Sequence, residues 1–113
     1  MHELAITKSM LDIVLNEAEK AGAKEVRIIN LVNGEMTGFV EDSVQFYFDF
    51  LSKGTPAEGA NLSFIVVSIK AQCRNCGKPF EPKESNWICP DCGSNGLDIT
   101  SGKELFVESI EVD

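Results

Sequence analysis

Two closely spaced cysteine pairs constrain the fold of this 113-residue chain more than any other feature of its sequence. The segments "CRNCG" and "CPDCG" form a CxxC–x12–CxxC pattern, with its cysteines at Cys73, Cys76, Cys89 and Cys92. Two residues between thiolates allow a tight turn to direct both sulfurs at one ion, and Gly77 and Gly93 permit the positive φ that such turns often need. Four thiolates complete a tetrahedral zinc site and leave no open position for catalysis. We therefore expect a structural Zn²⁺ site rather than four free thiols or two disulfides.

The pattern does not exclude iron as the bound metal. The segment "WICPDCG" resembles the second knuckle of rubredoxin, in which a tetrathiolate iron carries electrons. Rubredoxin places its cysteine pairs farther apart and wraps them in several aromatic residues, whereas Phe80 and Trp87 are the aromatic residues between the pairs in this chain. Zinc is the favoured metal, and an iron tetrathiolate redox protein is the alternative, which a red colour would reveal.

The charge of the chain argues against binding to nucleic acid or to an anionic membrane. The formal net charge is −8 and the pI is about 4.6. The cysteine module, residues 71–97, has three basic and three acidic residues: Arg74, Lys78, Lys83, Glu81, Glu84 and Asp91. Phosphate binding requires a clustered basic surface, which this module lacks. We expect the module to stabilise the fold and to contact other proteins.

The start of the chain indicates a cytoplasmic protein. The segment "MHELAITKSM" lacks the basic start and long apolar stretch of a secretory signal. No apolar run approaches the ~20 residues of a membrane span. Paired cysteines in a cytoplasmic protein point to a metal site rather than to disulfides.

Apolar spacing predicts two helices and three strands. They are a helix over 4–21, a strand within 24–36, a helix over 41–54, and strands over 62–72 and 103–113. The strand within 24–36 has apolar residues on both faces and is expected inside a sheet. The second helix contributes aromatic residues that are expected in the core: Phe46, Tyr47, Phe48 and Phe50. We expect an α+β fold, with a small three-stranded sheet, two helices and an inserted zinc-ribbon-like module of four cysteines between two strands that could be neighbours.

The amino terminus has the chemistry of a chelator. The α-amine of Met1, the amide nitrogen of His2 and the His2 imidazole stand in sequence and close a five-membered and a six-membered chelate ring. This planar nitrogen donor set suits Ni(II) or Cu(II) and fits poorly with tetrahedral zinc. Glu3 could supply an oxygen. The alternative is that His2, the only histidine of the chain, is a solvated terminal residue.

No constellation of residues points to catalysis. The single histidine leaves no second imidazole for acid–base chemistry, and there is no phosphate loop of the GxxxxGK[ST] type. Carboxylates such as Glu17, Glu19, Glu41 and Asp42 are typical of solvated helix faces or caps. We expect a protein that is not an enzyme.

Four segments together resemble the HypA-type nickel metallochaperones, which take part in hydrogenase maturation. They are "MHELAI", "GTPAEGANL", "CRNCG…CPDCGS" and "ITSGKELFVESIEV", and the resemblance spans essentially the whole chain. It implies Ni²⁺ bound by His2 with Met1 and Glu3 as further donors, and Zn²⁺ bound by the four cysteines. It also implies a nickel-binding domain at 1–70 plus 98–113 and a zinc-binding domain at 71–97.

The resemblance further implies protein partners. They are a nickel-handling GTPase of the same pathway, the large subunit of a [NiFe] hydrogenase and, for some relatives, urease maturation proteins. Some relatives carry histidines beside the cysteine pairs, but Gly77 and Gly93 stand there in this chain, so we expect no pH-linked ligand exchange at zinc. The alternative function is a zinc-ribbon adaptor between proteins without a transferable metal.

Overall fold

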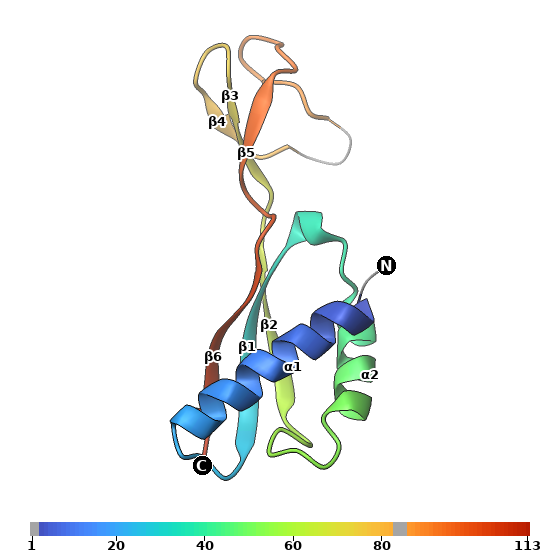
Figure 1. The fold of residues 1–113 in the computed structure, drawn as a ribbon. Helices are drawn as coiled ribbons and strands as arrows, with labels where there is room; N and C mark the ends of the chain where they lie inside the picture. The colour runs from blue at the N-terminus through green and yellow to red at the C-terminus, as the bar shows by residue number, and fades with distance from the viewer. Residues whose placement is uncertain (1–2, 83–85) are drawn as a thin grey trace. The chain divides into compact units, whose positions relative to one another are not determined.

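Within the described part of the chain, the fold contains two α-helices, one short 3-10 helix and two three-stranded sheets (Figure 1). The structure is a computed structural model, and it describes residues 3–82 and 86–113. Its elements are α1 (Glu3–Lys20), β1 (Val26–Gly34), the 3-10 helix η1 (Glu35–Thr37), α2 (Glu41–Leu51), β2 (Asn61–Val67), β3 (Lys70–Cys73), β4 (Pro79–Phe80), β5 (Leu97–Ser101) and β6 (Leu105–Val112). The predicted α+β class is confirmed, and the cysteine module adds a sheet that the sequence did not indicate. None of the described helices is long and apolar enough to cross a membrane.

The chain divides into two compact units. The first contains the residues up to Val32, Gly38–Ile65 and Leu105–Asp113, and the second contains Asn33–Thr37 and Val66–Glu104. The assignment of nickel binding to 1–70 plus 98–113, and of zinc binding to 71–97, concerns bound metals and stays a prediction.

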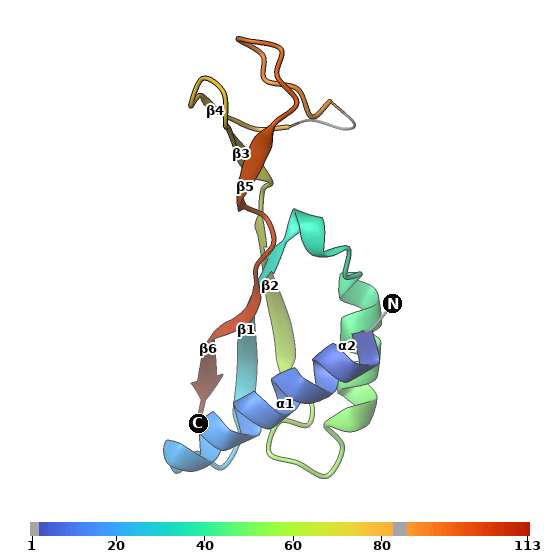
Figure 2. The ribbon, with the colours of Figure 1, turned by 45° about the horizontal axis from the view of Figure 1, so that its top comes forward.

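The first unit packs both helices with a sheet of order β2-β1-β6. Figures 1 and 2 show α1 crossing one face of this sheet. The predicted interior position of the first strand is confirmed, because β1 is central. The strands on either side of the cysteine module, β2 and β6, share this sheet but are not neighbours, because β1 separates them.

Helix α1 follows its predicted apolar stripe. Met10, Val14 and Ala18 are buried in the core at helical spacing. The helix ends before Gly22, whose φ is 64°, a left-handed conformation that glycine adopts at little steric cost. The boundaries of this helix were therefore readable from local sequence.

Helix α2 buries fewer aromatic side chains than expected. Phe48 is fully buried and Tyr47 is half-buried, but Phe46 and Phe50 are 69% and 67% exposed. A helix packed on one side buries one face, and residues two positions away from Phe48 point to nearly the opposite face. The expectation that all four aromatic residues lie in the core is wrong for Phe46 and Phe50.

The long strand expected over 62–72 is interrupted. Strand β2 ends at Val67 and β3 begins at Lys70. The backbone N–H of Ile69 donates to Glu35 Oε1 (2.9 Å), and the backbone carbonyl of Ser68 accepts from Ser101 Oγ (2.9 Å). The Glu35 and Ser101 side chains thus replace the hydrogen bonds that a neighbouring strand would supply. The strand can therefore break at Ser68 and Ile69 without leaving this N–H and this carbonyl unpaired.

The second unit contains the sheet β4-β3-β5, in which both neighbours of β3 are antiparallel to it. Ala71 pairs with Phe80 on one side, and Cys73 pairs with Leu97 on the other. Cys73 is the last residue of β3. The sheet therefore ends at the first cysteine and fixes the backbone from which the cysteine turns begin.

Candidate metal centre

The four cysteine sulfurs form one cluster in the second unit. All four Sγ atoms lie within 4.8 Å of one another, and the Cys73–Cys92 and Cys76–Cys89 Sγ pairs are each separated by 3.6 Å. Tetrahedral coordination with a Zn–S distance of about 2.3 Å requires sulfurs about 3.8 Å apart. The cluster therefore fits a four-thiolate zinc ion. Among the described residues it is also the only group of three or more metal-binding side chains.

The first cysteine pair forms a compact turn. The backbone N–H of Cys73 donates to the carbonyl of Lys78 (2.9 Å), and the N–H of Gly77 donates to the carbonyl of Cys73 (3.0 Å). Gly77 has a φ of 78°, which an L side chain rarely adopts. The turn brings Cys73 and Cys76 to the same side.

The second pair repeats the same hydrogen bonds. The N–H of Cys89 donates to the carbonyl of Ser94 (2.9 Å), and the N–H of Gly93 donates to the carbonyl of Cys89 (3.0 Å). Gly93 has a φ of 74°. The positive φ expected for the glycines after both pairs is thus present, and two equivalent turns each present two sulfurs.

Hydrogen bonds to sulfur prepare part of the cluster for metal binding. The Asn75 amide and then the Ser94 backbone N–H lower the pKa of Cys92 to about 6. The backbone N–H of Cys76 lowers the pKa of Cys73. These donors favour the thiolate, which is the form of cysteine that binds a metal.

The pKa of Cys76 is shifted in the opposite direction. The backbone N–H of Lys78 lowers the pKa of Cys76, but the hydrogen bond shared with Cys89, together with desolvation and the other two cysteines, outweighs it and raises this pKa to about 12. The Cys76 thiol therefore keeps its proton at neutral pH. A bound cation would have to displace it.

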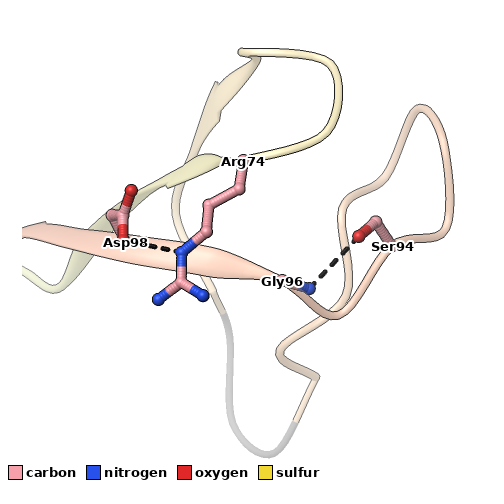
Figure 3. A network of polar contacts seen from close by, with 4 residues as sticks. All are labelled: Arg74, Ser94, Gly96 and Asp98. Atoms are coloured by element: carbon pink, nitrogen blue, oxygen red, sulfur yellow. Dashed lines mark hydrogen bonds and ion pairs between the residues drawn. The ribbon is translucent and has the colours of Figure 1, made fainter.

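Polar contacts connect the first turn to β5 (Figure 3). Arg74 Nε lies 2.8 Å from Asp98 Oδ1, and the Arg74 backbone N–H donates to the carbonyl of Gly96 (3.0 Å). The N–H of Gly96 in turn donates to Ser94 Oγ (3.2 Å). The Arg74–Asp98 pair is exposed, so it contributes only about 0–1 kcal/mol to stability. Its main effect is to neutralise a basic side chain of the module.

A second ion pair has the same consequence. Lys78 Nζ lies 3.4 Å from Asp91 Oδ2. With both basic residues of the cysteine turns paired to carboxylates, the described part of the module presents no clustered basic surface of the kind that phosphate binding requires.

The predicted nickel ligands are described only in part. Met1 and His2 lie outside the described residues. Glu3 begins α1 and is half-buried. Hydrogen bonds from its own backbone N–H and from that of Val40 lower the pKa of the Glu3 carboxyl. The Glu3 carboxyl is therefore ionised at neutral pH, and its assignment as a nickel ligand stays a prediction.

The sequence predicts the four cysteines that form the cluster, but it does not predict the role of Asn75. This residue stands inside the first CxxC pair and donates from Nδ2 to Cys92 Sγ in the second pair (3.6 Å). An amide side chain between two cysteines was the available signal. Its partner could not be read from the sequence, because it lies 17 positions away.

Comparison with known proteins identifies the family. A family model described as "Hydrogenase/urease nickel incorporation, metallochaperone, hypA" matches residues 1–112. The chain belongs to the HypA family. HypA proteins are nickel metallochaperones of hydrogenase maturation and not enzymes, and the resemblance inferred from the sequence is confirmed over the whole chain.

Individual HypA relatives agree with this assignment. The hydrogenase maturation factor HypA of Caldanaerobacter subterraneus subsp. tengcongensis is 45% identical over 114 residues, covering 100% of both chains. The HypA of Dehalococcoides mccartyi strain BAV1 is 45% identical over 113 residues, covering 100% of this chain and 95% of the relative.

Solved HypA structures share the fold. The solution structure of the Ni metallochaperone HypA from Helicobacter pylori matches with a TM-score of 0.69 at 21% identity, covering 99% of this chain and 97% of that one. Another solution structure of a HypA protein matches with a TM-score of 0.76 at 22% identity, covering 99% and 96%.

Proposed function

We propose that this HypA-family chain carries Ni(II) at its amino terminus and delivers it during maturation of a [NiFe] hydrogenase. The α-amine of Met1, the amide nitrogen of His2 and the His2 imidazole bind the ion in one plane, and Glu3 adds an oxygen or offsets charge. Such donors suit Ni(II), which is able to displace the amide proton. The observation that carries the proposal is the nickel-incorporation family match, which includes the terminal "MHE".

The terminal donor set also allows the cargo to leave. Three nitrogen donors leave at least one coordination position for a ligand from another protein. A recipient that supplies further ligands at that position can then take the ion stepwise. A carrier needs this property, whereas a structural site such as the cysteine cluster has no open position.

The cysteine cluster holds zinc as a structural ion in this proposal. Its ligands are Cys73, Cys76, Cys89 and Cys92, and their sulfur separations suit tetrahedral coordination. Binding of zinc stabilises the two turns and the sheet β4-β3-β5, because metal binding and folding are coupled in small thiolate sites. A Cys89→Ser variant then retains less than one zinc per chain and unfolds at a lower temperature than the wild type.

The proposed partners are those of nickel delivery. They are a nickel-handling GTPase, the hydrogenase large subunit and, where urease is present, urease maturation proteins. A reducing compartment such as the cytoplasm suits four thiols that bind a metal rather than pair as disulfides.

Nickel titration of protein with an unmodified amino terminus tests the proposal. His2→Ala, or an extension before Met1, is expected to weaken nickel binding at least tenfold, because either change removes part of the chelate. Glu19→Ala, which removes an exposed carboxylate at the other end of α1, is the matched control and leaves the affinity unchanged. Equal nickel affinity in all four proteins would refute the terminal site.

A further inference from the structure

Helix α2 carries the two most exposed large hydrophobic side chains among the described residues. Phe46 is 69% exposed and Phe50 is 67% exposed, while the next, Val66, is 57% exposed. Phe46 and Phe50 lie four residues apart, about one helical turn, so both fall on the same face of α2. Single exposed hydrophobic residues are ordinary, but an adjacent aromatic pair is typical of a protein-binding surface.

Phe46 and Phe50 do not pack in the hydrophobic core. The side of α2 that faces the core is filled by Val44 and Phe48, both buried. Phe46 stacks edge-to-face on its neighbour Tyr47, with ring centroids 5.5 Å apart. This contact restricts the orientation of the Phe46 ring without covering it, so a partner would meet a partly ordered aromatic side chain.

Carboxylates flank the aromatic pair. Asp42 and Asp49 are exposed, and positions 42, 46, 49 and 50 fall on one face by their helical spacing. The Gln45 amide donates to Asp49 Oδ1 (2.7 Å) and holds that carboxylate along the helix. We call Asp42, Phe46, Asp49 and Phe50 the α2 face.

A basic side chain of the same chain lies beside the α2 face. Lys53 Nζ lies 6.0 Å from the centroid of the Phe50 ring, at the distance of a cation–π contact. The formal charge of −8 adds a long-range attraction for cations. The face thus combines aromatic rings, carboxylates and a negative surrounding charge.

The α2 face begins close to the proposed nickel carrier segment. Val40 is the N-cap residue of α2, and its backbone N–H is hydrogen-bonded to the Glu3 carboxylate. Both residues belong to the first unit. A protein that contacts α2 would therefore stand near the start of α1, which follows Met1 and His2.

We propose that the α2 face is a docking surface for a basic protein partner, whose arginine side chains stack on Phe46 and Phe50 and pair with Asp42 and Asp49. This inference deepens the proposed function, on which it rests, by assigning a surface through which the nickel carrier engages another protein. Arginine suits the face because its planar guanidinium both stacks on an aromatic ring and binds a carboxylate through two N–H groups.

Other occupants fit less well. The carboxylates repel nucleic acid and anionic lipid. A second copy of this chain would place Asp42 and Asp49 against the same residues of the other copy, and like charges in contact disfavour association.

Binding measurements on full-length protein test the proposal. The probes are the nickel-handling GTPase and the hydrogenase large subunit from the same organism, each titrated with the wild type and with a Phe46→Ala/Phe50→Ala double variant. Aromatic residues at the centre of an interface commonly cost more than tenfold in affinity when truncated. We expect Kd to rise at least tenfold for one of the probes. Ile13→Ala, at a 53% exposed position on α1, is the matched control and changes Kd less than twofold.

A charge-reversal variant tests the basic character of the partner. Asp42→Lys/Asp49→Lys is expected to weaken the same interaction at low salt and to reduce its dependence on salt, because it removes attraction between opposite charges. Tighter binding by this variant, or a Kd within twofold of the wild type for the double phenylalanine variant, would overturn the proposal.

Nickel titration of the same proteins separates this inference from the proposed function. The double phenylalanine variant is expected to bind nickel as the wild type does. If the wild type binds nickel but neither probe, the docking surface is refuted and the terminal nickel site stands. If nickel binding itself is absent, the proposed function fails first.

Discussion

Asn75 Nδ2 donates a hydrogen bond to Cys92 Sγ over 3.6 Å and thereby joins the two cysteine pairs. Asn75 lies within the first pair, and Cys92 is the last residue of the second. The same amide is the largest cause of the lowered pKa of Cys92. Groups that donate to metal ligands orient them and stabilise their charged form, so Asn75 has a supporting role at the cluster.

Asn75→Ala is expected to weaken zinc binding about tenfold while leaving one zinc per chain at saturation. The four thiolates remain, but Cys92 loses its side-chain donor, and loss of such a supporting group commonly costs 10–100-fold in metal affinity. Competition with a chromophoric chelator measures the change. Asn95→Ala, at an exposed position in the same module, is the control. If both variants weaken zinc binding equally, Asn75 has no specific supporting role at Cys92.

Zinc affinity is expected to fall as the pH falls. The pKa of Cys76 is raised to about 12, so zinc must displace a proton at neutral pH, and the pKa of Cys92 near 6 means that a further proton competes below that pH. Each displaced proton changes the Kd about tenfold per pH unit, and the dependence should steepen below pH 6. Chelator competition between pH 8 and pH 5.5 measures it. A Kd that is constant over this range would contradict these protonation states of Cys76 and Cys92.

Gly34→Ala is expected to destabilise the second unit by about 2–3 kcal/mol. A Cβ at Gly34 would collide with the backbone carbonyl of Gly102, which also accepts a hydrogen bond from Met36 N–H (2.7 Å) and cannot easily move. Denaturant unfolding followed by Trp87 fluorescence reports on this unit. Gly96→Ala is the matched control, because its Cβ would lie 3.6 Å from Ser94 Oγ in ordinary contact. Equal stability of the two variants would show that the backbone at Gly34 adapts.

Phe48→Ala is expected to cost about 3–5 kcal/mol in the free energy of unfolding, because it removes a fully buried ring and leaves a cavity in the core. Phe46→Ala, two positions away on the exposed side of α2, is expected to cost less than about 0.5 kcal/mol. Circular dichroism at 222 nm during denaturation follows the helices. Similar losses for the two variants would mean that Phe46 contributes to packing and would weaken the assignment of the α2 face as a docking surface.

Local spacing predicted most of the secondary structure. The stripe at Met10, Val14 and Ala18 with Gly22 after it defined α1, because helix periodicity and a stop signal both act within a few residues. The break between β2 and β3 was not predictable in this way. The run around Ser68 and Ile69 has strong strand propensity, and it is interrupted where Glu35 and Ser101, each more than 30 positions away, supply hydrogen bonds.

The cysteine cluster and the family of the chain both follow from the sequence alone. Two residues between cysteines and a glycine after each pair suffice to form the turns, since a turn depends only on neighbouring residues. The packing of the folded chain decides which side of α2 faces the core. For this reason Phe48 is buried, while Phe46 and Phe50 are exposed. It also brings Asn75 to Cys92. Burial and long-range hydrogen bonds depend on which distant segment packs against a residue, and that information is absent from the spacing of any single segment.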